Sequence, residues 1–299
     1  MNFTIYPAAY KIFGMRSLKN YIKLMRLHHW VKNLLVFAPL FFAKHILDLD
    51  ATSKGILLFF SFSLLSSCVY IINDLIDVEY DKLHPGKQNR PLAAGEVSKQ
   101  NAIVLAIILV IVSGFLCYTL PIKAILILFA YLVVNIVYSF RLKQIPLLDI
   151  FIVASFYLMR IYAGGTLWRE GLSHWLILCT FFLALFLIVA KRRAEFCEYG
   201  GQNAKTRKVM ESYNKEFLDH MLVITITTAL TSYSIYVIST ATPYLLYSVF
   251  FVAFGLFRYL YIINQHNAGH APEKTLFSDK WILGSVIFWL LLNAILFYL

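Results

Sequence analysis

The sequence predicts an all-α integral membrane protein, built as a bundle of nine transmembrane helices. Composition supports this fold class, because 60% of the 299 residues are hydrophobic and the mean hydropathy is +0.69. Charged residues make up only 14% of the chain, against roughly 25% in a typical soluble domain. These values exclude a soluble globular domain, an intrinsically disordered chain and a disulfide-rich scaffold.

Nine apolar runs are long enough to cross the hydrocarbon layer, which takes about 20 residues of helix. The connections between most of these runs are short, so we expect residues 1–299 to form a single transmembrane helical domain. The predicted spans are 31–47, 55–76, 101–120, 122–140, 146–166, 173–190, 219–240, 244–263 and 280–299.

The segment 1–30 does not resemble a signal peptide, because it lacks an apolar core followed by a cleavage site. Leu18, Ile22 and Met25 recur at helical spacing, with basic residues between them. This pattern is typical of a basic amphipathic helix on an anionic membrane surface. We therefore expect 1–30 to be an interfacial segment.

The distribution of basic residues predicts the orientation of the bundle. With the N-terminus in the cytosol, 21 of the 27 lysines and arginines fall on cytosolic segments and only four on the opposite side. Cytosolic loops of membrane proteins carry such an excess. The sequence therefore predicts a cytosolic N-terminus and, after nine spans, a C-terminus on the other side.

Three aspartates follow the second predicted span. Asp74, Asp77 and Asp81 have the spacing i, i+3, i+7, which places them on one face of a continuous helix. Three carboxylates on one stripe repel one another, and a divalent cation relieves that repulsion. Mg²⁺ prefers carboxylate oxygens and completes its coordination with substrate phosphates. The stripe predicts a Mg²⁺–diphosphate site at the cytosolic membrane surface.

Further polar residues occur on the same predicted side. The loop after the stripe carries Lys87 and Arg90, which are typical phosphate-binding residues. Asp149 and Arg160, in the fifth predicted span, are eleven residues apart, so they point the same way about 16 Å apart along the helix. Charges within a span are candidates for function, although they also pair with other buried polar groups. Lys191 begins a basic run at the next cytosolic turn.

The motif Asn73-Asp74-x-x-Asp77-x-x-x-Asp81 in a chain of nine predicted helices resembles the UbiA-type membrane prenyltransferase superfamily. The extension Val-Glu-x-Asp-x-x-His-Pro-x-Lys over 78–87 is similar to one branch, the decaprenyl-phosphate phosphoribosyltransferases. Other stretches that resemble this branch are 30–33, 142–149, 160–165 and 191–195. The second motif departs from many members of the superfamily, because it holds Asp149 as its only acid, alongside Lys143.

The resemblance implies a Mg²⁺-dependent pentosyltransferase with a central cavity that faces the cytosol. A polyprenyl phosphate would attack C1 of phosphoribosyl pyrophosphate and displace pyrophosphate. The implied metal ligands are Asp74, Asp77 and Asp81, and the implied catalytic residues are these three with Lys143 and Asp149. The implied substrate-binding residues are Lys32, Asn73, Glu79, Tyr80, Lys87, Arg90, Tyr138, Arg160 and Lys191.

The implied location is the bacterial inner membrane, as a multi-pass protein with its active site toward the cytosol. We expect the lipid bilayer and the two substrates as partners, and no nucleic acid. The resemblance is compatible with a homo-oligomer and with a role in cell-wall precursor biosynthesis.

Two other functions stay open at this point. The chain resembles enzymes that move a prenyl group from a prenyl diphosphate to an aromatic or other acceptor. Transporters and channels also carry charges within their spans, but they place them near the midplane, often on interrupted helices. A purely structural membrane protein would leave the acid stripe unexplained.

Overall fold

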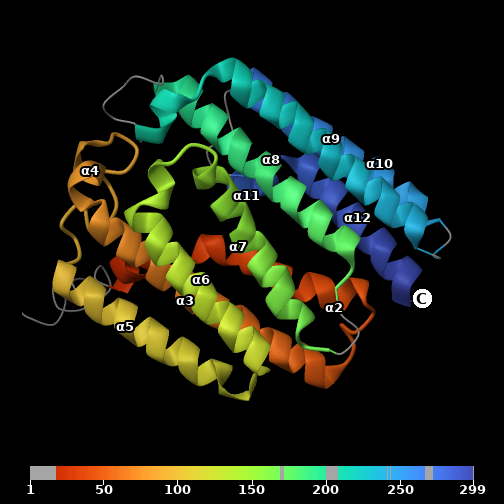
Figure 1. Cartoon of the computed structure of the whole chain (residues 1–299), viewed down its shortest axis with the longest axis horizontal. Helices are drawn as coiled ribbons and strands as arrows, with labels where there is room; N and C mark the ends of the chain where they lie inside the picture. Colours follow the sequence, from red (N-terminus) through yellow and green to blue (C-terminus); the bar gives the residue numbers. More distant parts are fainter. Residues whose placement is uncertain are drawn as a thin grey trace, which may run out of the picture.

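The computed structural model describes residues 18–168, 172–199, 208–240, 242, 244–266 and 272–298, and these residues form helices without a β-strand (Figure 1). The elements, in chain order after a first helix that covers 18–25, are η1 (Leu27–Phe37), α2 (Ala38–Phe42), α3 (Leu49–Ile76), α4 (Val78–Leu83), α5 (Lys99–Leu116), η2 (Cys117–Thr119), α6 (Ile122–Phe140), η3 (Leu142–Gln144), α7 (Leu148–Gly165), α8 (His174–Tyr199), η4 (Lys208–Ser212), α9 (Lys215–Ser239), η5 (Leu245–Tyr247), α10 (Ser248–His266), α11 (Pro272–Ser278) and α12 (Lys280–Tyr298).

Within the described ranges, eight helices are long and apolar enough to cross a membrane. The expected count of nine is not confirmed, because the predicted span 31–47 contains no single long helix. It forms the 3₁₀ helix η1 and the five-residue α2 instead. Pro39 lies in the first turn of α2, where its missing N–H is tolerated, whereas within a continuous α-helix it would remove a hydrogen bond.

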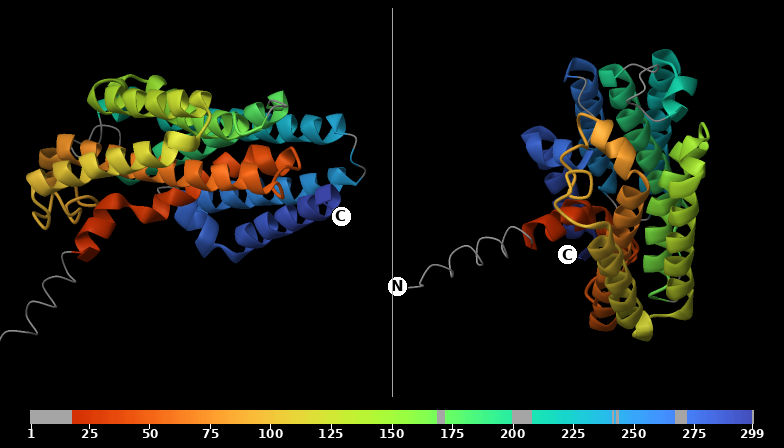
Figure 2. Two further views of the ribbon diagram at one scale, coloured as in Figure 1. Left: turned by 90° about the horizontal axis from the view of Figure 1, so that it is seen from below. Right: turned by 90° about the vertical axis from the view of Figure 1, so that its left-hand side faces the viewer.

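Helix α7 lies at the centre of the packing. It contacts η1 and α6 on one side and α8 on the other, while α3 packs against α5, α6 and η1. Ile150 and Ala154 of α7 belong to an apolar core shared with α8, α9, α10 and α12. Phe156 and Ala163 belong to a second core shared with η1, α3 and α6. Figure 2 shows the segment before α3, in red, running along one face of the bundle.

Two backbones approach closely in this packing. Such contacts are common between helices in membranes, where small residues at the interface allow tight van der Waals packing. A methyl group at Gly164 of α7 would overlap the carbonyl oxygen of Val36 in η1. Glycine therefore lets η1 lie directly against α7, and this contact positions the polar residues that η1 carries.

Polar side chains cap the N-termini of several of the long helices. Asp48, Ser98 and Asn214 accept hydrogen bonds from the first free N–H groups of α3, α5 and α9. Asp279 does the same for α12. Such caps satisfy donors that have no partner inside the helix. They explain why these spans begin where they do.

The helix over 18–25 has an amphipathic arrangement. Leu24 is fully buried against α3 and α5, whereas Leu18 and Ile22 are 62% and 45% exposed. Exposed apolar residues beside exposed lysines are expected of a helix in the membrane interface. The first part of the predicted interfacial segment, residues 1–17, lies outside the described residues.

Candidate active site

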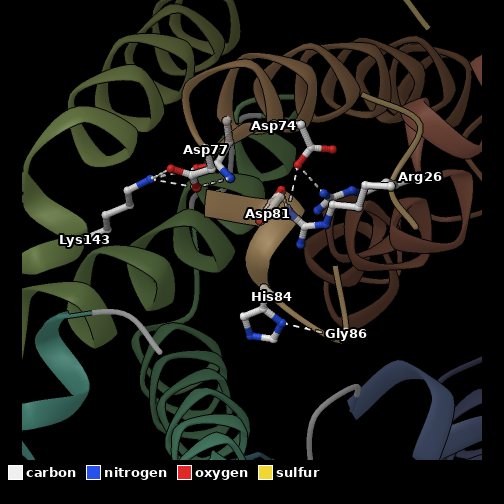
Figure 3. Close-up of polar contacts among 9 residues, drawn as sticks. Arg26, Asp74, Asp77, Asp81, His84, Gly86 and Lys143 are labelled. Carbon is white, nitrogen blue, oxygen red and sulfur yellow. Dashed lines mark hydrogen bonds and ion pairs between the residues drawn. The ribbon is translucent and has the colours of Figure 1, made fainter. Parts of the chain in front are cut away.

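The acid stripe lies where α3 ends, at the end of the bundle that also carries α4 (Figure 1). A continuous helix through Asp74, Asp77 and Asp81 was expected, but α3 ends at Ile76 and α4 begins at Val78. Asp77 is the residue between them and adopts φ −92° and ψ 6°. Because the helix is interrupted at Asp77, the three carboxylates do not share one face. Figure 3 shows Asp74 and Asp81 near one another and Asp77 turned to the other side.

Two arginines bind the Asp74 and Asp81 carboxylates. Nη1 of Arg90 donates to Oδ1 of Asp74 at 3.0 Å and to Oδ2 of Asp81 at 2.6 Å. Nη2 of Arg26 donates to the same Oδ1 of Asp74 at 2.5 Å. Both aspartates are buried, whereas the side chains of Arg26 and Arg90 are 16% and 26% exposed. The acids are therefore fixed, and their cationic partners are accessible.

Asp81 has an unusual environment. Its Oδ1 is buried and has no hydrogen-bond partner among the described residues. Burial raises the pKa of Asp81, and the neighbouring Arg90 opposes that rise. A buried carboxylate oxygen without a donor is costly, so it is a candidate for binding a cation.

Asp77 belongs to a separate cluster with Lys143 and Asn73. Nζ of Lys143 donates to Oδ1 and Oδ2 of Asp77 at 2.7 and 2.9 Å, and to Oδ1 of Asn73 at 3.4 Å. The Asn73 amide donates to Asp77 at 3.1 Å. Lys143 comes from η3, so this cluster joins the α6–α7 connection to the end of α3.

The residues fit a magnesium ion through two carboxylates rather than three. In the described part of the chain, no group of three acidic, histidine or cysteine side chains is placed to hold a metal. Mg²⁺, however, is commonly held by one or two carboxylates together with substrate phosphates and water. Asp74 and Asp81 supply that pair, and Oδ1 of Asp81 is a free ligand atom. The magnesium site stays a prediction, with Asp77 at its edge.

Asp149, predicted as catalytic, is fully buried in α7 and has all its oxygens engaged. Nε of Arg192 donates to Oδ2 at 2.8 Å, and the hydroxyl of Tyr213 donates to Oδ1 at 2.6 Å. The Tyr213 hydroxyl also accepts from the N–H of Leu147 at 2.8 Å. The predicted residue Tyr138 donates to the carbonyl oxygen of Asp149 at 3.5 Å. Asp149 thus joins α6, α7, α8 and the connection between η4 and α9.

Arg160 does not pair with Asp149. Its Nε donates to Oδ1 of Asn33 at 2.6 Å and its Nη2 to the Tyr131 hydroxyl at 3.1 Å. The guanidinium also lies over the rings of Phe62, Tyr131 and Tyr157. The half-buried Lys32 interacts electrostatically with Tyr131. Arg160 and Lys32 therefore share one polar region inside the bundle.

The other predicted substrate-binding residues lie on the outer parts of the site. Glu79 is exposed and pairs with Lys82 on the same helix. Nζ of Lys87 lies 5.5 Å from the centre of the Tyr80 ring. Lys191 is exposed in the last third of α8. An apolar pocket between α6 and α7 contains none of the predicted site residues, so the cytosol-facing cavity stays a prediction.

From the sequence alone, no role in the site was assigned to Arg26, His84, Arg192, Glu195 or Tyr213, although the motifs 78–87 and 191–195 contain three of them. Burial lowers the pKa of His84, Lys87 adds to this effect, and Glu195 opposes it, which places the end of α8 close to the loop after α4. Nη1 of Arg192 donates to Glu195 at 3.0 Å. The basic run 191–193 did signal a cation here, but the buried ones are Arg192 and Arg193. Nothing local signalled Arg26, which is 48 residues from Asp74.

Comparison with known proteins places this arrangement in a family. The model of the UbiA prenyltransferase family matches residues 34–292. The chain belongs to the UbiA prenyltransferase family. This UbiA-family enzyme is a multi-span membrane protein.

Similar proteins cover nearly the whole UbiA-family chain. The decaprenyl-phosphate phosphoribosyltransferase of Mycolicibacterium smegmatis is 34% identical over 275 residues, which are 87% of this chain and 86% of the relative. The protein of the same name from Corynebacterium glutamicum is 30% identical over 90% of this chain and 83% of its own length. A UbiA homologue from Archaeoglobus fulgidus, solved bound to DMAPP and Mg²⁺, superimposes with a TM-score of 0.72 at 19% identity. That superposition covers 93% of this chain and 99% of the homologue, and it supports the fold.

Proposed function

We propose that this enzyme transfers the phosphoribosyl group of phosphoribosyl pyrophosphate to a polyprenyl phosphate in a bacterial membrane, with Mg²⁺. A phosphate oxygen of the lipid forms a bond to C1 of the ribose. The bond between C1 and the pyrophosphate oxygen breaks, and its electron pair leaves with pyrophosphate. The acceptor is already an anion, so the reaction needs no general base.

The observation that carries this proposal is the ratio of cations to acids around α3 and α4. Asp74 and Asp81 are a buried pair suited to one magnesium ion, and Arg26, Arg90 and Lys143 balance the charge of this pair and of Asp77 at the same helix ends. A magnesium ion added to this neutral set would supply the positive charge that a donor with a diphosphate and a separate 5-phosphate requires. The similarity to decaprenyl-phosphate phosphoribosyltransferases supports the same donor.

Each group has a role in this reaction. Magnesium held by Asp74 and Asp81 would stabilise the charge that develops on pyrophosphate. Arg90 and Lys143 position the phosphates, because a guanidinium binds phosphate in a two-pronged way and a lysine acts as a point charge. Lys32 and Arg160 are further candidates for a phosphate group. The acid site faces the cytosol in this proposal, because the basic residues predict that side.

Transfer of a prenyl group is the second candidate. The Archaeoglobus homologue was solved with DMAPP, a prenyl diphosphate, and its fold is the same. The two candidates differ in which substrate carries the diphosphate, because the first places it on the water-soluble donor.

One assay distinguishes them. Purified protein is incubated with Mg²⁺, a polyprenyl phosphate and phosphoribosyl pyrophosphate labelled in the ribose, and the lipid phase is then extracted. We expect label in the lipid phase from the wild-type protein and from the Lys82→Gln control, and about a hundredth of it or less from Asp81→Asn. Turnover of a prenyl diphosphate without label in the lipid would reject the phosphoribosyl reaction.

A further inference from the structure

Arg26 and Arg90 reach the acid pair from two segments outside the long helices. Arg26 lies between the helix over 18–25 and η1, and Arg90 lies in the loop between α4 and α5. Nζ of Lys23 donates to the carbonyl oxygen of Asn89 at 2.6 Å, so the two segments are tied together next to the arginines. The arrangement is a clasp of two chain segments over two buried aspartates.

The backbone of Arg26 has a special conformation. Its φ of 54° and ψ of 51° lie in the left-handed region, which is unfavourable for a residue other than glycine. The guanidinium also lies 4.9 Å from the centre of the Tyr70 ring. Together with the bond to Asp74, these contacts fix the arginine at the acid pair, and strain of this kind is typical of functional sites.

The arginines occupy one oxygen of each aspartate, and Oδ1 of Asp81 stays open to a ligand. Oδ1 of Asp74 accepts from both Arg26 and Arg90, and Nη1 of Arg90 bridges Asp74 and Asp81. A guanidinium on these atoms neutralises the pair, as a divalent cation would. A metal ion that binds both aspartates through these same oxygens therefore displaces Arg90. The released guanidinium groups stay close by, because their chain segments are anchored, and each then has a two-pronged donor set for an anion.

We propose that Arg26 and Arg90 form an exchangeable clasp, which neutralises Asp74 and Asp81 without a metal and binds the diphosphate of the donor once the metal is in place. The identity of this diphosphate rests on the proposed function, whereas the competition with the metal does not. Arg26 thereby becomes a diphosphate-binding residue. The exchange couples the two ligands, so each binds more tightly when the other is present.

Binding of Mn²⁺ alone tests the first half of the proposal. The full chain in detergent is titrated with Mn²⁺, and the free ion is measured by electron paramagnetic resonance. We expect Arg26→Gln and Arg90→Gln to bind Mn²⁺ about tenfold more tightly than wild type, which is the size of one charge-assisted hydrogen bond. Lys82→Gln is the matched control, because it removes a cation of α4 that pairs with the exposed Glu79. We expect its Mn²⁺ affinity to equal that of wild type.

Binding of inorganic pyrophosphate tests the second half. With saturating Mg²⁺, we expect pyrophosphate to bind about tenfold more weakly to Arg26→Gln and to Arg90→Gln, and unchanged to Lys82→Gln. Arg26→Lys and Arg90→Lys keep the charge but lose the two-pronged donor set, and we expect intermediate affinities. If a glutamine variant does not fold, the pyrophosphate affinities of the lysine variants are compared with that of wild type instead.

Unchanged or weaker Mn²⁺ binding in both arginine variants would overturn the clasp. Unchanged pyrophosphate affinity would overturn the role of Arg26 and Arg90 as diphosphate ligands. Neither result depends on the donor, because pyrophosphate is common to both candidate reactions. A wild-type protein that shows the expected metal and pyrophosphate effects, but no transfer of phosphoribose, would instead reject the proposed function.

Discussion

Asp81 and Asp149 are both almost fully buried and both bind an arginine. They differ in how many of their carboxylate oxygens accept hydrogen bonds and in how exposed the partner arginine is. Both oxygens of Asp149 accept hydrogen bonds, and its partner Arg192 has a side chain that is 5% exposed. Oδ1 of Asp81 has no partner, and the side chain of Arg90 is 26% exposed.

The difference teaches that burial alone does not identify a catalytic acid. A buried carboxylate whose oxygens all accept hydrogen bonds from buried groups typically has a structural role. Removing its cationic partner would leave an uncompensated charge inside the protein. A buried carboxylate with a free oxygen and an accessible cation keeps room for a ligand. On this comparison, we propose that Asp81 takes part in the reaction and that Asp149 positions the helices around it.

The largest effect is expected at Asp81. Asp81→Asn removes a charge from the acid pair, so we expect phosphoribosyl transfer to fall by about 100-fold or more, the size of losing one strong electrostatic contribution. The free energy of unfolding should change less than for Asp149→Asn, because the amide oxygen of asparagine can still accept from Arg90, and Arg90 keeps its ion pair with Asp74. Label transfer and thermal unfolding in detergent measure the two quantities. Activity within threefold of wild type would remove Asp81 from the site.

Asp149 should respond in the opposite way. Asp149→Asn takes one of two charge partners from the buried Arg192, since Glu195 remains, and we expect a loss of about 3 kcal/mol in stability, near the low end for broken buried pairs. Tyr213→Phe removes one hydrogen bond and should cost about 1–3 kcal/mol. Thermal unfolding compares the two variants. The triple variant Asp149→Leu, Arg192→Met and Glu195→Gln is the control, since it removes all three charges of this network and should recover much of the loss.

His84 links the two regions and predicts a dependence on pH. Burial lowers its pKa below the ordinary 6.5, with Lys87 and Arg90 adding to the effect and Glu195 opposing it. The folded state therefore favours neutral His84. Its stabilising contribution is present above pH 6.5 and is lost as the pH falls through the lowered pKa.

We expect the melting temperature of wild type to fall more between pH 7.5 and 5 than that of His84→Asn. Asparagine also offers an acceptor to the N–H of Gly86, which donates to Nδ1 of His84 at 3.1 Å (Figure 3). Identical pH profiles for the two proteins would show that His84 titrates as in an unfolded chain.

The smallest effect is expected at Glu79, the acid that shares α4 with Asp81. It is exposed and pairs with Lys82 and Lys99, and exposed pairs of this kind contribute little. We expect Glu79→Gln to leave transfer activity and melting temperature unchanged. A clear loss of activity would extend the site to the outer face of α4 and weaken the distinction between free and satisfied acids.

The sequence alone predicted most of the membrane architecture. Hydropathy and length are sufficient for eight spans, because any helix in hydrocarbon has to be long, apolar and internally hydrogen-bonded. The same pattern was wrong about 31–47, since hydropathy does not report whether a helix is continuous. Only packing against α3 and α7, with Gly164 in contact with η1, shows how this segment folds.

The residues of the site divide in the same way. Asp74 and Asp81 were predictable, because they lie close together in the chain and their spacing survives the break at Asp77. The arginine partners of these acids were not predictable, because Arg26 is 48 residues from Asp74 in the chain. Likewise, Tyr213 is 64 residues from Asp149. Spacing along the chain determines which residues share one helix, whereas the contacts between helices decide which charges meet. The sequence therefore determined that this protein spans a membrane and carries an acid motif, and only the tertiary structure decided which acids are satisfied and which one keeps a free oxygen.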